Sequence, residues 1–263
     1  MVGADVAHLD LEDSVAGDDK ERARMALGGH FVSRRTLPLA VRINALHTRE
    51  GIRDVSFILD NEFIPQILIL PKFSVHRDLE LAHGLFVEAG HLDTQLFGVV
   101  ETVRTLCELR GLDARPPGLD GLIFGAADFA TEMGIELTQA NLRFVRQEIA
   151  LAARRFGVLA IDSPCFDVRG HTVLRHELRV ARSLGFHGKI AIHPDQVPLI
   201  SELMAPPVSQ VERARRLLAA QAEVARNGKD ATIIRHEGKI AGPPFVKYAE
   251  KLIASISDPK KEG

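Results

Sequence analysis

Two acidic residues, Glu101 and Asp128, follow short apolar runs at points where a helix is expected to begin. Glu101 comes directly after the run Leu96–Val100, and Asp128 comes shortly after the run Gly121–Phe124. Short apolar runs before helix starts are typical of buried parallel strands, and α/β folds place their chemistry at the carboxyl ends of such strands. Two carboxylates delivered to one edge of a sheet suit a hard cation. We therefore expect a Mg2+ site and an enzyme.

Three further acids follow the first apolar run of the chain. Asp10, Glu12 and Asp13 fall within four consecutive positions, and alternation along an extended segment would aim Asp10 and Glu12 in the same direction. Asp13 or Ser14 could instead cap the next helix. A cap needs only one such residue, so we expect at least one of these acids to face the site as a general base, with Glu12 and Asp13 as candidates.

Other strand ends carry polar side chains with more than one interpretation. Arg42 has the planar fork that holds a carboxylate through two hydrogen bonds, although a surface ion pair is an equally good interpretation. Lys72 could offer a second cation or be a flexible exposed lysine, and Asp162 adds another acid. His193 is interpreted as a hydrogen-bonded residue rather than a ligand. Cys165 is interpreted as a packed thiol, because the sequence shows no partner base for it.

Composition excludes several classes of protein. The chain has 263 residues, 46% of them hydrophobic and 26% charged, with a formal net charge of -2. That balance argues against a general nucleic-acid binder, which needs basic residues to neutralise phosphates. The two cysteines indicate a reducing cytoplasm rather than a disulfide scaffold. No apolar stretch approaches the roughly 20 residues that span a bilayer, and the first residues do not resemble a signal peptide.

The elements that must position these residues alternate between strand and helix. Seven strand-like runs are separated by segments of helical periodicity, which predicts a parallel sheet with helices outside it. The runs are 6–11, 39–43, 66–70, 96–100, 121–124, 158–161 and 189–192. We expect a TIM-type (β/α)8 barrel over residues 1–204 that lacks its first strand–helix unit, with an open doubly wound sheet as the alternative. Residues 205–263 are expected to form a helical extension that packs on the barrel or on a neighbouring subunit.

Taken together, these segments resemble the citrate lyase β-subunit-like branch of the HpcH/HpaI aldolase family. The similarity runs in family order over most of residues 5–200, and the last motif is especially specific. The segments that carry it are LDLEDSV at 9–15, VRIN at 41–44, LPK at 70–72, VET at 100–102, GLIFGAAD at 121–128, AID at 160–162 and GFHGKIAIHPDQ at 185–196.

The resemblance implies a TIM barrel in which Glu101 and Asp128 bind Mg2+ and Arg42 holds a substrate carboxylate or carbonyl oxygen. It also implies a carbon–carbon lyase acting on β-hydroxy acyl-CoA thioesters such as citryl-CoA or malyl-CoA, assembled as a homotrimer or hexamer. Two features depart from the family pattern. The family's first strand, with its Pro-Gly turn and arginine, is not seen, and the Ser-Pro-Cys-Phe-Asp segment after Asp162 indicates a different substrate preference.

The leading hypothesis is therefore a Mg2+-dependent lyase that proceeds through a metal-stabilised enolate. Glu12, Asp13 and Arg42 are the expected catalytic residues. The substrate is expected to contact Arg42, Glu101, Lys72 and Asp162. One alternative is an aldolase of free 2-oxo acids such as pyruvate or oxaloacetate, and another is a catalytically silent binding subunit of the same family.

Overall fold

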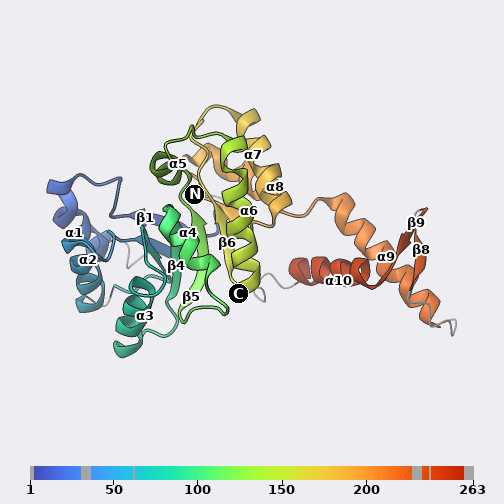
Figure 1. Cartoon of the computed structure of the whole chain (residues 1–263), viewed down its shortest axis with the longest axis horizontal. Coiled ribbons are helices and arrows are strands. Elements are labelled where there is room, and N and C mark those ends of the chain that lie inside the picture. Colours follow the sequence, from blue (N-terminus) through green and yellow to red (C-terminus); the bar gives the residue numbers. More distant parts are fainter. Residues whose placement is uncertain (1–2, 31–36, 62, 227–232, 237, 258–263) are drawn as a thin grey trace. The chain divides into compact units, whose positions relative to one another are not determined.

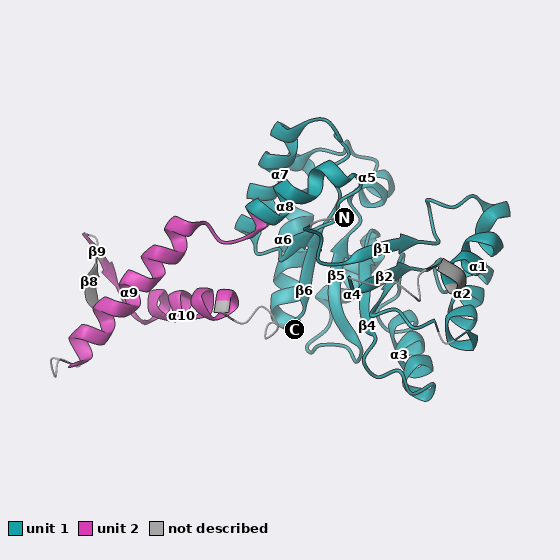
Figure 2. Ribbon diagram, turned by 180° about the vertical axis from the view of Figure 1, so that it is seen from behind, with its two compact units in different colours: residues 1–202 teal, residues 203–263 magenta. Residues whose placement is uncertain are grey.

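The computed structural model describes residues 3–30, 37–61, 63–226, 233–236 and 238–257. The chain divides into two compact units, residues 1–202 and 203–263, which Figure 2 colours separately. Each unit has its own buried apolar cluster. The two units are therefore described one at a time.

Unit 1 is an α/β unit built on a seven-stranded sheet with sequential strand order β1-β2-β3-β4-β5-β6-β7 (Figure 1). Every neighbouring pair is parallel. The strands are β1 (Ala7–Asp10), β2 (Leu39–Arg42), β3 (Ile67–Leu70), β4 (Gln95–Val100), β5 (Leu119–Phe124), β6 (Leu159–Asp162) and β7 (Gly188–Lys189). The prediction of a parallel α/β sheet is confirmed, and its sequential order fits a TIM-like barrel. The doubly wound alternative is wrong, because that fold reverses its strand order at a switch point.

Helices occupy the connections between the strands, as the periodicity predicted. They are α1 (Lys20–His30), α2 (Arg49–Asp60), α3 (Asp78–Glu88), α4 (Val103–Arg110), α5 (Ala126–Met133), α6 (Gln139–Phe156), α7 (His171–Leu184) and α8 (Val197–Met204), with 3-10 turns η1 (Gly17–Asp19) and η2 (Pro194–Gln196). The last strand differs from the prediction of 189–192. It ends at Lys189, and beyond it the Ile192 amide donates to the side chain of Gln196, which turns the chain into η2.

Alternation along the strands decides which residues face which layer. One face of the sheet carries a cluster that includes Ala40, Ile69, Val99 and Ile123, with Ile161 packed against it. Because side chains alternate along a strand, residues two positions further along point to the same side. Arg42 and Glu101 therefore continue the face of this cluster, whereas Asp162 belongs to the opposite, helix-covered face.

Neither Glu101 nor Asp128 caps the helix that follows its strand. Thr102 accepts a hydrogen bond from the amide of Thr105 and so begins α4, directly after Glu101. Helix α5 begins from Gly125 with no side-chain cap, and Asp128 lies inside its first turn. Both carboxylates are therefore available for other contacts.

Unit 2 pairs two helices with a short hairpin. Helices α9 (Val208–Arg226) and α10 (Pro243–Ser257) bury Ala214, Leu217, Ala241 and Ala249. Strands β8 (Ile234–His236) and β9 (Lys239–Ala241) form an antiparallel pair. The prediction that this extension packs on the barrel or on a neighbouring subunit stays a prediction.

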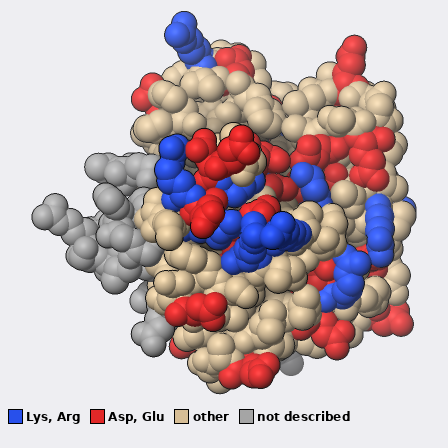
Figure 3. Space-filling model, turned by 90° about the vertical axis from the view of Figure 1, so that its left-hand side faces the viewer, with Lys and Arg blue, Asp and Glu red and all other residues tan. Residues whose placement is uncertain are grey.

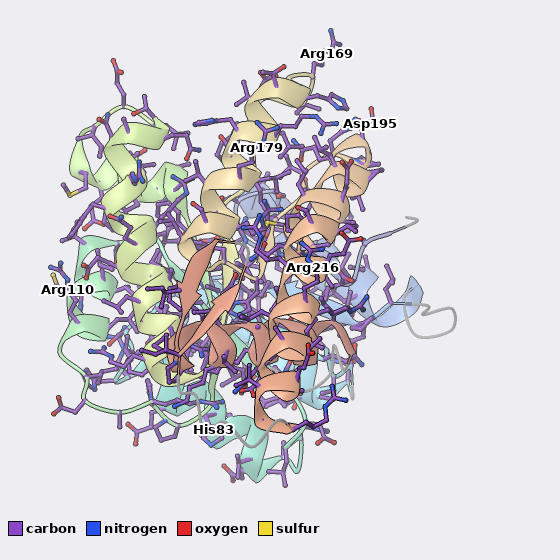
Figure 4. All side chains as sticks on the ribbon, turned by 90° about the vertical axis from the view of Figure 1, so that its right-hand side faces the viewer. His83, Arg110, Arg169, Arg179, Asp195 and Arg216 are labelled. Atoms are coloured by element: carbon purple, nitrogen blue, oxygen red, sulfur yellow. The ribbon has the colours of Figure 1, made fainter. Side chains whose placement is uncertain are left out.

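Charges of both signs mix on the surface, and some of the labelled side chains of unit 1 lie at two opposite ends. On the face in Figure 3, acidic and basic side chains gather side by side rather than separating by sign. Figure 4 shows Arg169 and Asp195, which follow β6 and β7, at one end of unit 1, and His83 of α3 at the other. In the part of the chain that the structure describes, no helix has the length and apolar character needed to cross a bilayer.

Candidate active site

Arg42, the last residue of β2, lies among the acids that follow β1. Its Nε and Nη2 donate to the two oxygens of Asp10 at 2.8 and 2.6 Å. Its Nη1 lies 3.0 Å from Glu12 Oε2 and 3.7 Å from Asp13 Oδ2. Burial opposes ionisation of Asp10, but hydrogen bonds from Arg42 and Ser14 outweigh it and hold the pKa of Asp10 well below its usual range. The first run thus delivers its acids to Arg42. The next helical turn, η1, begins from Ala16, so neither Asp13 nor Ser14 is its cap.

Lys72 connects these acids to the residues that follow β4 and β5. Its backbone amide donates to Glu101 Oε1 at 2.6 Å, and its Nζ lies 2.9 Å from Glu12 Oε1. The same ammonium lies 3.8 Å from Asp13 Oδ1 and 4.0 Å from Asp128 Oδ2. Lys72 has a φ of 46° and is the one residue other than glycine with a positive φ among those described. The predicted second cation therefore sits at the centre of the site in an unusual backbone conformation.

Glu101 is a buried carboxylate without a cationic partner. It is 2% exposed, and among the described residues its one hydrogen bond comes from the Lys72 amide and no ion pair reaches it. Burial raises the pKa of Glu101 to about 8, with the nearby charges of Glu12 and Asp128 adding to the rise. Gly125 makes room for it, since a Cβ there would lie 2.4 Å from the Glu101 Cβ and 2.7 Å from its Oε2.

The donor set of this pair fits Mg2+. Glu101 and Asp128 offer hard carboxylate oxygens, which is the chemistry that Mg2+ prefers. The Asp128 side chain is 44% exposed and its cationic contact is Lys72 at 4.0 Å, so the pair of carboxylates holds more negative charge than its neighbours neutralise. The described residues contain no group of three or more His, Cys, Asp or Glu side chains arranged to hold an ion. A cation here would depend on two protein carboxylates, and Mg2+ commonly keeps several waters in such a site.

Comparison with known proteins decides the family. The sequence pattern of the HpcH/HpaI aldolase/citrate lyase family matches residues 1–194. The chain belongs to this family. It is 32% identical to the L-malyl-CoA/beta-methylmalyl-CoA lyase of Cereibacter sphaeroides, over 95% of this chain and 86% of that protein. It is also 29% identical to the mitochondrial citramalyl-CoA lyase of Rattus norvegicus, over 98% of this chain and 81% of that protein. The resemblance seen in the sequence is confirmed.

A solved structure of the HpcH/HpaI family shares the fold. The chain is similar to CitE from Mycobacterium tuberculosis in complex with magnesium, acetoacetate and coenzyme A, with a TM-score of 0.79 and 29% identity. The match covers 97% of this chain and 91% of that one. The architecture of unit 1 is therefore one that another member of the family also uses.

Asp162 is placed differently from the other predicted site residues of this family member. It is 0% exposed, its Oδ1 accepts from Arg146 Nε at 2.8 Å, and its Oδ2 accepts from Lys189 Nζ at 2.8 Å. Lys189 also lies 2.9 Å from Glu177 Oε2, and the Arg146 guanidinium lies over the Phe124 ring at 5.0 Å. Asp162 thus points into the helix layer and belongs to a buried ionic quartet, Asp162–Arg146–Lys189–Glu177, rather than to the group around Arg42.

Sequence reasoning missed a second buried network, which supports the acids after β1. Asp54 of α2 is fully buried and accepts from the amide and side chain of Asn44 at 2.8 and 2.7 Å, and from Arg24 at 2.8 Å. Asn44 in turn donates to the backbone oxygen of Leu11 at 2.9 Å. An aspartate four positions before Ile58, and so on the same face of the helix, was the available signal, because an acid among core positions needs a partner.

His193 and Cys165 make hydrogen bonds to residues outside the group around Arg42. His193 accepts a hydrogen bond from the Asp195 amide through Nδ1, as expected for a hydrogen-bonded rather than a ligating histidine. Burial raises the pKa of the Cys165 thiol, which agrees with a packed rather than a nucleophilic cysteine. A pocket beside α3, lined in part by His83 and His91, contains none of the predicted site residues.

Proposed function

We propose that this chain is a Mg2+-dependent carbon–carbon lyase acting on a β-hydroxy acyl-CoA thioester of the malyl-CoA, citramalyl-CoA or citryl-CoA type. The observation that carries the proposal is the buried, unpaired carboxylate of Glu101 beside Asp128, at the same sheet edge as Arg42. Burying a charge without a counter-ion is costly. Its presence in a member of a lyase family is explained by a cation that the site is built to receive.

Glu101 and Asp128 would hold Mg2+. When bound, the ion supplies positive charge that stabilises negative charge developing on a substrate oxygen. The Lys72 amide fixes one oxygen of Glu101, and Gly125 leaves the space that the carboxylate occupies. These two contacts preorganise the buried ligand before any ion arrives.

Glu12 is the better placed of the two candidate bases. Burial raises the pKa of Glu12, although contacts with Lys72 and Arg42 oppose the rise, and a raised pKa brings a carboxylate closer to the working pH of a general base. In cleavage, the base removes the proton of the β-hydroxyl, and the hydroxyl oxygen forms a carbonyl as the adjacent carbon–carbon bond breaks. The bond electrons pass to the thioester enolate, which then takes up a proton. Asp13, which is more exposed, is the second candidate.

Arg42 is the candidate for holding the substrate's carboxylate or carbonyl oxygen. Asp10 fixes the guanidinium through two hydrogen bonds and leaves Nη1 facing Glu12 and Asp13, where a substrate oxygen could share it. Lys72 lies on the same side and is a second candidate. Asp162 is left out of the proposed substrate site, because both of its oxygens are taken by buried cations.

We further propose the barrel type, the assembly and the cellular compartment of the lyase. The seven strands fit a (β/α)8 barrel less one strand–helix unit, with unit 2 packing on unit 1 or on a neighbouring subunit in a homotrimer or hexamer. The free cysteines suit the cytoplasm. Light scattering of the purified chain tests the assembly, and a monomer would contradict it.

The test of the function is product formation from malyl-CoA, citramalyl-CoA and citryl-CoA with Mg2+, beside free oxaloacetate and other 2-oxo-acid aldol substrates. We expect cleavage of at least one thioester, and loss of turnover in Glu101→Gln and Asp128→Asn with folding retained. Glu88→Gln, on an exposed glutamate of α3, is the matched control and should keep wild-type turnover. Full activity in either site variant would contradict the metal assignment. Cleavage of free acids alone would favour the alternative of a 2-oxo-acid aldolase. No turnover of any substrate would favour the alternative of a catalytically silent binding subunit.

A further inference from the structure

Lys72 acts on the site through both its backbone and its side chain. The left-handed conformation at φ 46° is strained for a residue with a Cβ, so it persists only where surrounding contacts hold it. Here the amide is directed to Glu101 and the ammonium to Glu12, at 2.6 and 2.9 Å. One residue therefore touches a proposed metal ligand and the proposed base.

The Lys72 ammonium is surrounded by carboxylates. Glu12, Asp13 and Asp128 lie within 4.0 Å of Nζ, and Glu101 adds a favourable charge interaction from further away. Ion pairs and the Lys72–Glu101 hydrogen bond connect five acids with two cations, while the Lys20 ammonium donates to the backbone oxygens of Leu11 and Glu12. The acids are Asp10, Glu12, Asp13, Glu101 and Asp128, and the cations are Arg42 and Lys72.

The two cations form ion pairs with some of these acids and not with others. Arg42 pairs with Asp10, and both Arg42 and Lys72 pair with Glu12 and Asp13. Glu101 has no ion pair among the described residues, and the Lys72 contact of Asp128 is the longest of those that Lys72 makes. The acids proposed for proton transfer, Glu12 and Asp13, are thus partly neutralised by the protein, and the acids proposed for the metal are left nearly uncompensated.

We propose that Lys72 is a positioning residue that limits the affinity of the site for Mg2+ and directs the ion to Glu101 and Asp128. Its ammonium neutralises part of the carboxylate cluster and repels a divalent cation from Glu12 and Asp13. This inference rests on the proposed function, because it assumes that Glu101 and Asp128 receive the ion. Such a residue would fix the position of Mg2+ at Glu101 and Asp128 while keeping the affinity of the site low enough for the ion to exchange.

The test is Mg2+ binding to the full chain by isothermal titration calorimetry, without substrate. We compare wild type with Lys72→Met, Lys72→Asn and Lys72→Arg. Asparagine is a second neutral variant, because it tolerates positive φ better than most residues. Arg104→Met removes a positive charge from α4 that pairs with Glu108 instead, and it serves as the charge control. The titration is done at about pH 9, well above the usual pKa range of carboxyl groups.

We expect Lys72→Met and Lys72→Asn to bind Mg2+ about tenfold more tightly than wild type. The Lys72 ammonium lies 4.0 Å from Asp128 Oδ2, a proposed ligand oxygen, and a unit charge so near the site repels a divalent ion appreciably even with solvent screening. Lys72→Arg and Arg104→Met should stay near the wild-type affinity. The sign is decisive, because structural damage to the site would weaken binding. Equal or weaker binding by both neutral variants, with circular dichroism unchanged, would overturn the inference.

The metal assignment can fail separately. Binding to the neutral variants but not to wild type would support the role of Lys72 and contradict the proposed Mg2+ requirement of the native chain. Binding to none of the proteins would overturn both.

Discussion

Replacing Lys189 by Met should destabilise the protein severely. The Lys189 side chain is 0% exposed, and its ammonium lies 2.8 Å from Asp162 Oδ2 and 2.9 Å from Glu177 Oε2. It also donates to the backbone oxygen of Ser163 at 2.6 Å. Methionine has a similar length and fills similar space. The variant therefore removes the charge and the hydrogen bonds with little change in packing.

The size of the loss in unfolding free energy follows from the charges that Lys189→Met leaves without a partner. Without Lys189, Asp162 keeps Arg146 as its counter-ion, while Glu177 loses the ion-pair partner that the structure gives it. Breaking a buried pair by removing one partner costs about 3–5 kcal/mol, because it leaves an uncompensated charge. That is a large share of the roughly 5–15 kcal/mol by which a domain is stable. An exposed pair such as Arg104–Glu108 is worth about 0–1 kcal/mol.

Urea unfolding followed by circular dichroism measures these free energies. We expect Lys189→Met to lose about 3–5 kcal/mol and Arg104→Met to lose less than about 1 kcal/mol. Adding Glu177→Gln to Lys189→Met should recover part of the loss, because it removes the orphaned charge. A loss below about 1 kcal/mol in Lys189→Met, or no recovery in the double variant, would refute the view that the quartet is a coupled ionic network.

Two further predictions concern the candidate site itself. Gly125→Ala should weaken Mg2+ binding at least tenfold, as measured by calorimetry. The new Cβ would lie 2.4 Å from the Glu101 Cβ, so the carboxylate must move. Unchanged affinity would show that Glu101 is not a ligand. Asp10→Asn should cost about 2 kcal/mol near neutral pH, since it removes a charge-assisted pair with Arg42. The pKa of Asp10 is lowered in the folded state, so this stability is present above the unfolded pKa of about 4 and is lost as the pH falls through the folded value. The difference between Asp10→Asn and wild type in urea unfolding should therefore shrink in acid, and a difference that is constant down to about pH 2 would contradict it.

Much of the fold and part of the site could be predicted from short-range patterns. Apolar runs and helical periodicity predicted seven strands in a parallel sheet, because burial on both faces of a strand leaves a mark in the sequence. The same runs placed Arg42, Glu101 and the acids after β1 at one edge. The end of β7 was predicted too late in the chain. Residues 190–192 are apolar, but the strand ends at Lys189 and the Ile192 amide donates to the Gln196 side chain instead of continuing the sheet.

Other features depend on distant contacts that composition does not reveal. The left-handed backbone of Lys72 is set by its contacts with Glu101 and Glu12, which lie far away in sequence. The buried support of Asp54 for Asn44 required knowing that the two elements meet. Glu101 and Thr102 occupy adjacent positions before α4, and the structure shows that Thr102 is the cap.

Asp162 shows that ending a strand at the active edge does not by itself make a residue part of the site. It ends β6 much as Arg42 ends β2, yet Ile161 and not Asp162 continues the inner face of the sheet, so Asp162 enters the helix layer and meets Arg146. That position still connects to the site, because the Arg146 guanidinium lies over Phe124, next to Gly125 and the space that Glu101 occupies. The parity of a residue along its strand therefore separates acids that face the proposed site from acids that pair with cations in the helix layer. By that criterion Glu101 belongs to the first kind and Asp162 to the second.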